Sequence, residues 1–353
     1  MKRLFICLVF VLAALATQAQ DIHFSQYYLS PLNLNPAMTG VMNCNSRIVG
    51  NYRSQWSSVL GSSAFRTYSL SYDQRIPVGR SDYFGIGGTF WGDRAGEVQF
   101  STTMAKLSAS YSKKMGGYRN KAHYLVVGGE AGIANRGIDA RELKWPIQND
   151  GNGGYDEMIS SGEVLSDGGT QIYPDFSAGL MWFTVLDKNN SFYIGGAYYH
   201  LNTPNISFIS GDDSDADLSA RYVAHAGGDF LLNSKFGIVP GFIFMKQGPS
   251  IQAKPGLSLK FLLPSGRGEY QAFQVGGWVR VASRVATEDS GSMLVDAAIL
   301  STRFDYNTFS VGFSYDINLS DLAAVSNNNG GFELAVIYKV CKNERRNVYC
   351  PRF

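Results

Sequence analysis

The chain has 353 residues, of which 45% are hydrophobic, 13% aromatic and only 17% charged. This aromatic-rich, charge-poor composition is unusual for a soluble protein. Without Lys2 and Arg3, which belong to the signal peptide described next, 29 basic residues balance 29 acidic ones, so the charge gives no basis for binding nucleic acid.

Residues 1–19 have the features of a secretory signal peptide. The basic start at Lys2 and Arg3 precedes an apolar run over 4–15, and Thr17-Gln18-Ala19 offers the small side chains that a signal peptidase accepts. The run is too short to span a membrane, and no later stretch offers roughly 20 uninterrupted apolar residues. We therefore expect an exported protein that can cross a membrane only with strands.

The next segment, residues 20–45, is too rich in Asn, Pro and Ser to form a spanning strand, and its Asn35-Pro36 step favours a turn. We expect it in the periplasm or inside the barrel that the following residues predict. Exposed aromatic side chains would make it a handle for a periplasmic partner, whereas the alternative is a cap on the barrel floor. The candidate partner-binding residues are Phe24, Ser25, Gln26, Tyr27, Tyr28, Asn35 and Pro36.

Residues 46–341 are dominated by alternating segments. In 308–317, for example, Phe309, Val311 and Phe313 alternate with Ser310, Gly312 and Ser314, a period of two that indicates a sheet with one apolar face. About 14 such strand candidates behind a signal peptide predict an all-β fold, a transmembrane antiparallel up-and-down β-barrel. They begin near Arg47, Ala64, Asp82, Val98, Lys121, Gln171, Ser191, Leu218, Lys235, Ile251, Glu269, Ser292, Asn307 and Asn329.

The length of each connection depends on whether it follows an odd-numbered or an even-numbered strand. The longest ones come after odd-numbered strands, at 139–170, 202–217 and 283–291, with 247–250 as a short exception; the even ones are tight turns, such as 187–190, 233–235 and 304–306. If the first strand starts at the periplasm, this layout gives short periplasmic turns and longer extracellular loops. Both termini, including a C-terminal tail at 342–353, would then be periplasmic.

Glycine pairs recur inside the strand candidates. Glycine weakens a strand, so their repetition indicates either sharp curvature or close approach of another group inside the lumen, and we favour curvature. The pairs are 87–88, 128–129, 195–196, 227–228 and 276–277.

Several charged residues fall on the inward face of the predicted strands. Buried charges require partners, so we expect Arg53 to lie among Asp73, Asp316 and Glu333, close to where the first and last strands meet. Such a network would fill the lumen. The alternative is that these charges are solvated in a water-filled channel.

Export leaves three cysteines, Cys44, Cys341 and Cys350, in an oxidising compartment. Cys44 precedes the first strand and Cys341 ends the last, and these strands are neighbours in a closed barrel, so a Cys44–Cys341 disulfide would join the seam. Pairing of Cys350 with either of them, or three free thiols, remain alternatives.

Signals of catalysis or metal binding are weak. The four histidines form no HExxH or similar ligand spacing, and no nucleophile elbow or phosphate-binding loop occurs. His225 and Asp229 could share a strand face, and the acidic run 211–217 lacks the ordered glycine and closing glutamate of a calcium loop. We expect no catalytic residues, metal or cofactor.

Residues 24–40, FSQYYLSPLNLNPAMTG, resemble the opening motif of the PorP/SprF family of type IX secretion membrane proteins, and the likeness continues in NYRSQW at 51–56 and YYHLN at 198–202. The resemblance implies an outer-membrane barrel of Bacteroidota that supports secretion or surface attachment of cargo proteins, in some members adhesins of gliding motility. It implies other type IX secretion components, cargo proteins and the lipid bilayer as partners. The alternative function is an outer-membrane diffusion channel or transporter.

Overall fold

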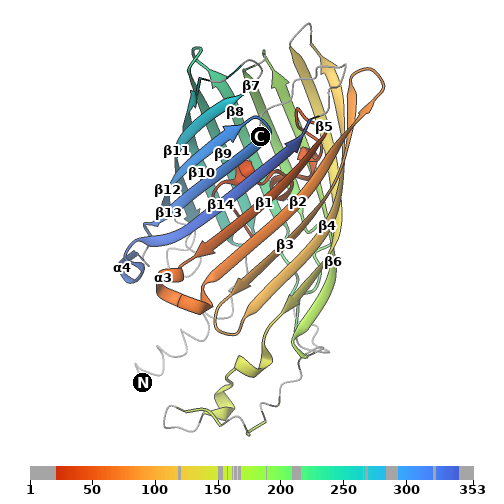
Figure 1. Ribbon diagram of the computed structural model, residues 1–353. Helices are drawn as coiled ribbons and strands as arrows, with labels where there is room; N and C mark the ends of the chain where they lie inside the picture. Colours follow the sequence, from red (N-terminus) through yellow and green to blue (C-terminus); the bar gives the residue numbers. More distant parts are fainter. Residues whose placement is uncertain are drawn as a thin grey trace.

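The computed structural model describes residues 21–117, 121–149, 154–156, 158–160, 162, 165, 168–187, 189–208, 216–264, 266, 269–283, 293–320 and 323–341. The expected signal peptide and the tail at 342–353 lie outside these residues. The described residues form a closed antiparallel barrel of fourteen strands in chain order, in which the first strand pairs with the last (Figure 1). The predicted all-β up-and-down barrel is therefore confirmed.

Each strand begins within three residues of its predicted start, because alternation and turn residues are local signals that the sheet preserves. The strands are β1 (Ser46–Gln55), β2 (Phe65–Val78), β3 (Asp82–Ala95), β4 (Phe100–Gly116), β5 (Ala122–Gly137), β6 (Thr170–Val185), β7 (Ser191–Tyr199), β8 (Arg221–Leu231), β9 (Phe236–Gln247), β10 (Ser250–Leu262), β11 (Gln271–Ser283), β12 (Met293–Tyr306), β13 (Phe309–Asn318) and β14 (Asn329–Val340).

The two faces of the sheet differ as the alternation predicts. In β13, Phe309 and Phe313 are 40% and 47% exposed on the outside of the barrel, whereas Ser310, Ser314 and Asp316 are buried inside it. An outward apolar face and a polar interior are the arrangement of a barrel surrounded by lipid. Within the described residues no helix is both long and apolar enough to cross a membrane.

The connections sort to two ends of the barrel. The odd end, at the bottom of Figure 1, carries the connections after odd-numbered strands, which include α3 (Ser57–Leu60), η3 (Gly61–Ser63), η4 (Ala140–Glu142), η5 (Pro146–Gln148) and α4 (Ala323–Ser326). The even end carries short turns. The turn expected at 304–306 is displaced: those residues finish β12, and the chain reverses at Asn307, which has a positive φ of 51°. Most of the connection expected at 283–291 lies outside the described residues.

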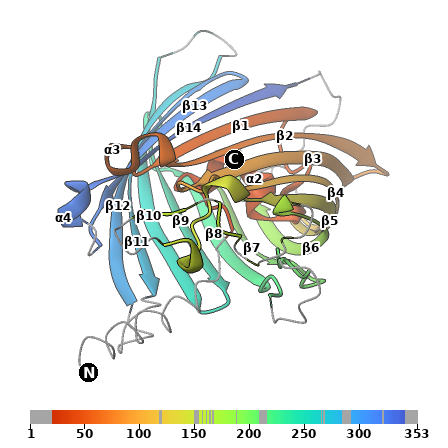
Figure 2. The ribbon, with the colours of Figure 1, turned by 90° about the horizontal axis from the view of Figure 1, so that it is seen from below.

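Residues 21–45, here called the plug, run through the interior of the barrel. They contain η1 (Tyr27–Leu29), α2 (Pro31–Leu34) and η2 (Pro36–Met38), and α2 is seen within the ring of strands in Figure 2. Buried apolar plug residues such as Ala37 and Met38 belong to one cluster with wall residues such as Tyr124 and Met181. The main hydrophobic core of this protein therefore lies inside the lumen, around the plug.

Candidate functional site: the plugged lumen

The plug crosses the barrel from the odd end to the even end. At the odd end, the Asp21 N–H donates to Oε1 of Gln247, the last residue of β9, at 2.9 Å. At the even end, Cys44 precedes β1 and is joined to Cys341, the residue after β14, by a disulfide with a Cα–Cα distance of 4.4 Å. The described chain thus begins and ends at opposite ends of the barrel, and the expectation of two termini on one side is wrong for these residues.

The disulfide closes the seam between the first and last strands, which is the pairing favoured by the position of the two cysteines along the chain. Ser46 pairs with Val340 in the β1–β14 ladder, and the cysteines follow directly beyond that pair. Cys350, the alternative partner, lies outside the described residues. Beside Cys44 is a cavity of about 200 Å³, lined by cations and carboxylates that include Lys260, Arg303 and Asp305.

The inner plug, residues 35–40, packs directly on glycines of the wall. A Cβ atom placed on Gly128 would lie 2.6 Å from the Ala37 Cα, and a Cβ on Gly85 would collide with the Thr39 carbonyl oxygen. Asn35 fills the space beside Gly179, and its amide nitrogen donates to the Leu180 carbonyl at 3.1 Å. These contacts leave no room for a side chain at Gly85, Gly128 or Gly179.

One glycine of each predicted pair therefore allows close approach inside the lumen, the alternative that we did not favour. In each predicted pair one glycine lies against an interior group, while Gly88, Gly129, Gly196 and Gly277 have looser surroundings or none within 4 Å. The interior neighbours are Thr39 and Asp73 at Gly87, Ala37 at Gly128, His225 at Gly195, Tyr193 at Gly227, and Ser258 and Ser301 at Gly276.

Arg53 lies at the centre of one buried charge network. Its guanidinium contacts Glu333 at 2.6 Å and Asp316 at 3.1 Å, and Arg280 reaches Asp316 from the next strand but one at 2.8 Å. These side chains are 7% exposed or less. The network therefore behaves as a buried structure that is stable only while every charge keeps its partner.

Asp73 does not join this network, contrary to our expectation. It pairs with Arg47 at 2.8 Å and accepts a hydrogen bond from the Gly40 N–H, also at 2.8 Å. The reason is strand register: Asp73 is directly opposite Arg47 in the β1–β2 ladder, whereas Arg53 is opposite Thr67. Six residues along a strand separate two side chains by about 20 Å.

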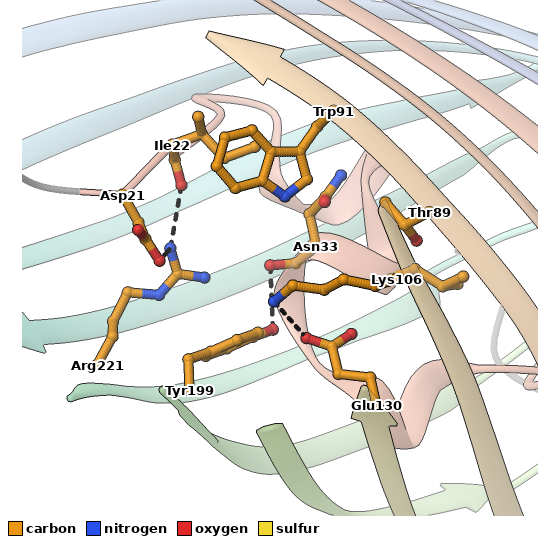
Figure 3. A pocket seen from close by; sticks show the side chains of 10 residues that line it. Asp21, Ile22, Asn33, Thr89, Trp91, Lys106, Glu130, Tyr199 and Arg221 are labelled. Atoms are coloured by element: carbon orange, nitrogen blue, oxygen red, sulfur yellow. Dashed lines mark hydrogen bonds and ion pairs between the residues drawn. The ribbon is translucent and has the colours of Figure 1, made fainter. Parts of the chain in front are cut away.

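A second network at the odd end escaped the sequence analysis. Lys106 contacts Glu130 at 2.8 Å and Asp175 at 2.7 Å, and the His200 ring contacts Asp175 at 2.5 Å and Asp21 at 2.6 Å. Figure 3 shows Lys106 and Glu130 beside the plug residues Asp21, Ile22 and Asn33. The alternation of the sequence could have predicted this network, because it places Lys106, Glu130 and Asp175 on the inward face of three consecutive strands.

The ionisation of His200 is set by these neighbours. Burial disfavours the protonated ring, but the carboxylates of Asp21 and Asp175 outweigh burial and raise the pKa of His200 to about 9. In the same way, His200 and Arg221 outweigh burial and hold the pKa of Asp21 well below its usual range. At neutral pH the start of the plug is thus held by ion pairs of Asp21 with His200 and Arg221.

The predicted partner-binding side chains are placed inside the lumen and are not exposed. Phe24, Ser25, Gln26 and Tyr27 are at most 4% exposed, and Tyr28 stacks on Trp278 with ring centroids 5.1 Å apart. Asn35 and Pro36 are also buried. The expectation of a solvent-exposed handle is therefore wrong, because burial of these aromatic surfaces against the lumen wall stabilises the threaded plug.

His225 and Asp229, which could share a strand face, have different partners. His225 lies 2.9 Å from the amide nitrogen of Asn35, whereas Asp229 pairs with Lys260 at 2.5 Å. Most of the acidic run 211–217 lies outside the described residues. In the part of the chain that the structure describes, no three His, Cys, Asp or Glu side chains are grouped to hold a metal ion.

Comparison with solved structures gives distant barrel matches. CdiB from Escherichia coli is 9% identical with a TM-score of 0.46, and the match covers 82% of this chain and 63% of CdiB, so this chain spans less than two thirds of that protein. The monoaromatic hydrocarbon channel CymD is 11% identical with a TM-score of 0.47, covering 90% of this chain and 94% of that one. The toluene transporter TbuX from Ralstonia pickettii is 8% identical, with a TM-score of 0.43, and the match covers 89% of this chain and 94% of TbuX.

Comparison with curated proteins gives no match. The sequence model of the type IX secretion system membrane proteins PorP/SprF, in contrast, matches residues 16–338 and so includes both the plug and nearly the whole barrel. Because this match covers far more than half of the chain, the protein belongs to the PorP/SprF family of type IX secretion system membrane proteins.

Proposed function

We propose that this protein is a closed outer-membrane barrel of the type IX secretion system that supports secretion or surface attachment of cargo proteins, including adhesins of gliding motility. The observation that carries the proposal is the plug, which fills the lumen from Asp21 to Cys44. A component that holds or passes on proteins does not need an open path for small solutes.

A diffusion channel, the competing function, requires a continuous aqueous path along the barrel. The cavities beside the start of the plug have volumes of about 10 to 20 Å³, which is room for about one water molecule each. The larger cavity near Cys44 is lined by the ion pairs Lys260–Asp229 and Arg303–Asp305. The filled lumen therefore favours the secretion role.

Our proposal places the odd end outside the cell and the even end in the periplasm. Support comes from the short turns at the even end and from the long β5–β6 connection at the odd end. In this orientation the Cys44–Cys341 disulfide is periplasmic, where other secretion components would meet the barrel. The plug then begins on the outer side.

The test is deletion of the gene, followed by comparison of the secreted and surface proteomes with those of the wild type and of a strain complemented with the full chain. We expect specific cargo proteins to disappear from the surface or the medium, and colony spreading to fall if adhesins are among them. Planar bilayers should show no conductance from the purified barrel. Unchanged proteomes together with impaired uptake of small solutes would instead establish the channel.

A further inference from the structure

The wall binds the outer plug, residues 21–34, to a large extent through main-chain atoms. Glu333 accepts hydrogen bonds from the Ser25 and Gln26 N–H groups, and Lys254 donates to the Phe24 carbonyl at 2.7 Å. The other main-chain contacts are Asp21 N–H to Gln247, and the carbonyls of Ile22, Leu29 and Asn33 with Arg221, Asn51 and Tyr199. Main-chain groups are common to all peptides, so this wall can hold a segment of another sequence that follows the same path.

The charges of this wall are mostly paired. The cations Arg53, Lys106, His200, Arg221, Lys254 and Arg280 lie among the carboxylates Glu130, Asp175, Asp296, Asp316 and Glu333, and Asp21 of the plug is a further partner of His200 and Arg221. A balanced set of donors and acceptors suits the dipoles of a neutral peptide main chain. It does not favour a small ion of either sign, which would leave the opposite set without partners.

The outer plug is also the part that can leave. Inner-plug atoms meet wall backbone at Gly85 and Gly128, whereas the outer plug meets wall glycines with side-chain ends, as Leu29 and Gln26 do at Gly312. Cavities of about 20 Å³ adjoin Ile22 and His23. Ile22 packs against a buried cluster that includes Leu218 of the β7–β8 connection, and Ile206 of the same connection packs against that cluster too.

From these contacts we infer that the outer half of the lumen is a peptide-binding site, which residues 21–34 of the chain itself occupy and which takes a segment of a surface-attached protein in their place. The inner plug stays seated and keeps the barrel sealed. The incoming segment enters from the odd end, where the outer plug begins. This inference rests on the proposed function, since it names how the barrel would hold its cargo.

The first test uses the purified full chain and fluorescent synthetic peptides. In Leu29→Glu, a charge replaces a side chain that is 1% exposed among Val49, Ala335 and Ile337, so the outer plug should be expelled. Val59→Glu, on exposed α3, is the matched control. Heat-dependent gel mobility verifies the folded barrel, and Tyr27→Ser with Tyr28→Ser is a second opened variant.

A peptide with the sequence of residues 21–34 should bind the opened variants at least about tenfold more tightly than the wild type, in which the tethered plug competes at high effective concentration. A scrambled peptide of the same composition should bind more weakly than the first, because it loses the packing of Tyr27 and Leu29, but its main-chain groups should keep its binding measurable in the opened variants. N-methylation at the positions of Ser25 and Gln26 should abolish binding. Binding of the native sequence alone, or of no peptide, would overturn the inference.

The second test locks the plug in cells with engineered disulfides. The outer lock is Asn33→Cys with Ser69→Cys, whose uncharged side chains are joined by a hydrogen bond of 2.8 Å, and the inner lock is Thr39→Cys with Ser108→Cys, whose side-chain oxygens lie 2.9 Å apart. The four single variants are controls. We expect the outer lock to abolish surface attachment of cargo and the inner lock to preserve it.

The two hypotheses fail in different ways. If the outer lock forms and attachment stays at the wild-type level while gene deletion abolishes it, the peptide site is wrong and the proposed function stands. If gene deletion itself leaves the surface and secreted proteomes unchanged, the proposed function is wrong, and the peptide site loses its cargo with it.

Discussion

Two adjacent glycines of β5 should respond in opposite directions to the same substitution. In Gly128→Ala the new methyl group would lie 2.6 Å from the Ala37 Cα and the Pro36 carbonyl oxygen, whereas carbon atoms in contact are about 3.5–4.0 Å apart. The atoms that the methyl group would meet belong to the plug backbone, so the clash cannot be relieved by a change of side-chain rotamer. Overpacking of this kind costs about 1–3 kcal/mol.

Gly129→Ala is the matched control, because its methyl group would have only the Ser177 carbonyl oxygen within 4 Å, at 3.7 Å. Replacing a strand glycine by alanine without a clash should stabilise by about 0.5–1 kcal/mol. The two variants should thus differ in free energy of unfolding by about 1.5–4 kcal/mol. Only the clash at Gly128, about 1–3 kcal/mol, acts on the equilibrium between seated and displaced plug, which it should change by about 5- to 150-fold.

The assays are the midpoint of heat-dependent gel mobility and conductance in planar bilayers. Gly128→Ala should unfold at a lower temperature and show conducting openings, while Gly129→Ala should be at least as stable as the wild type and closed. If the two variants have the same unfolding temperature and neither conducts, close packing of the inner plug on β5 is refuted.

Three further predictions concern charge and topology. Arg53→Ala removes the partner of buried Glu333 and should lower the free energy of unfolding by about 3–5 kcal/mol, whereas Lys113→Ala, at an exposed pair, should leave it almost unchanged; equal effects in thermal unfolding would argue for a solvated lumen. His200 has its pKa raised to about 9 from 6.5, so its contribution is complete below about pH 6.5 and is lost as pH rises through 9; the labelling rate of Ile22→Cys, divided by that of the exposed reference Val59→Cys to cancel thiol ionisation, should increase between pH 7 and 10, and His200→Gln should remove that increase. Protease added to intact cells should cut within residues 149–169 and spare 186–190, and the reverse preference would invert the proposed orientation.

The number and limits of the strands follow from the sequence itself. Alternation in segments such as 308–317 reports which side chains face lipid, and turn residues such as those at 233–235 end the strands; both signals are local and survive folding unchanged. The sequence also indicates the Cys44–Cys341 pairing, because closure of an up-and-down barrel brings its first and last strands together.

The contents of the lumen were decided only by the tertiary structure. Whether Asp73 meets Arg47 or Arg53 depends on the β1–β2 register, and whether Gly128 serves curvature or contact depends on where Ala37 lies. The path of the plug brings Asp21 to His200, 179 residues away in the chain. No local pattern encodes such contacts, because they result from the fit of one irregular segment to the interior of a barrel closed by all fourteen strands.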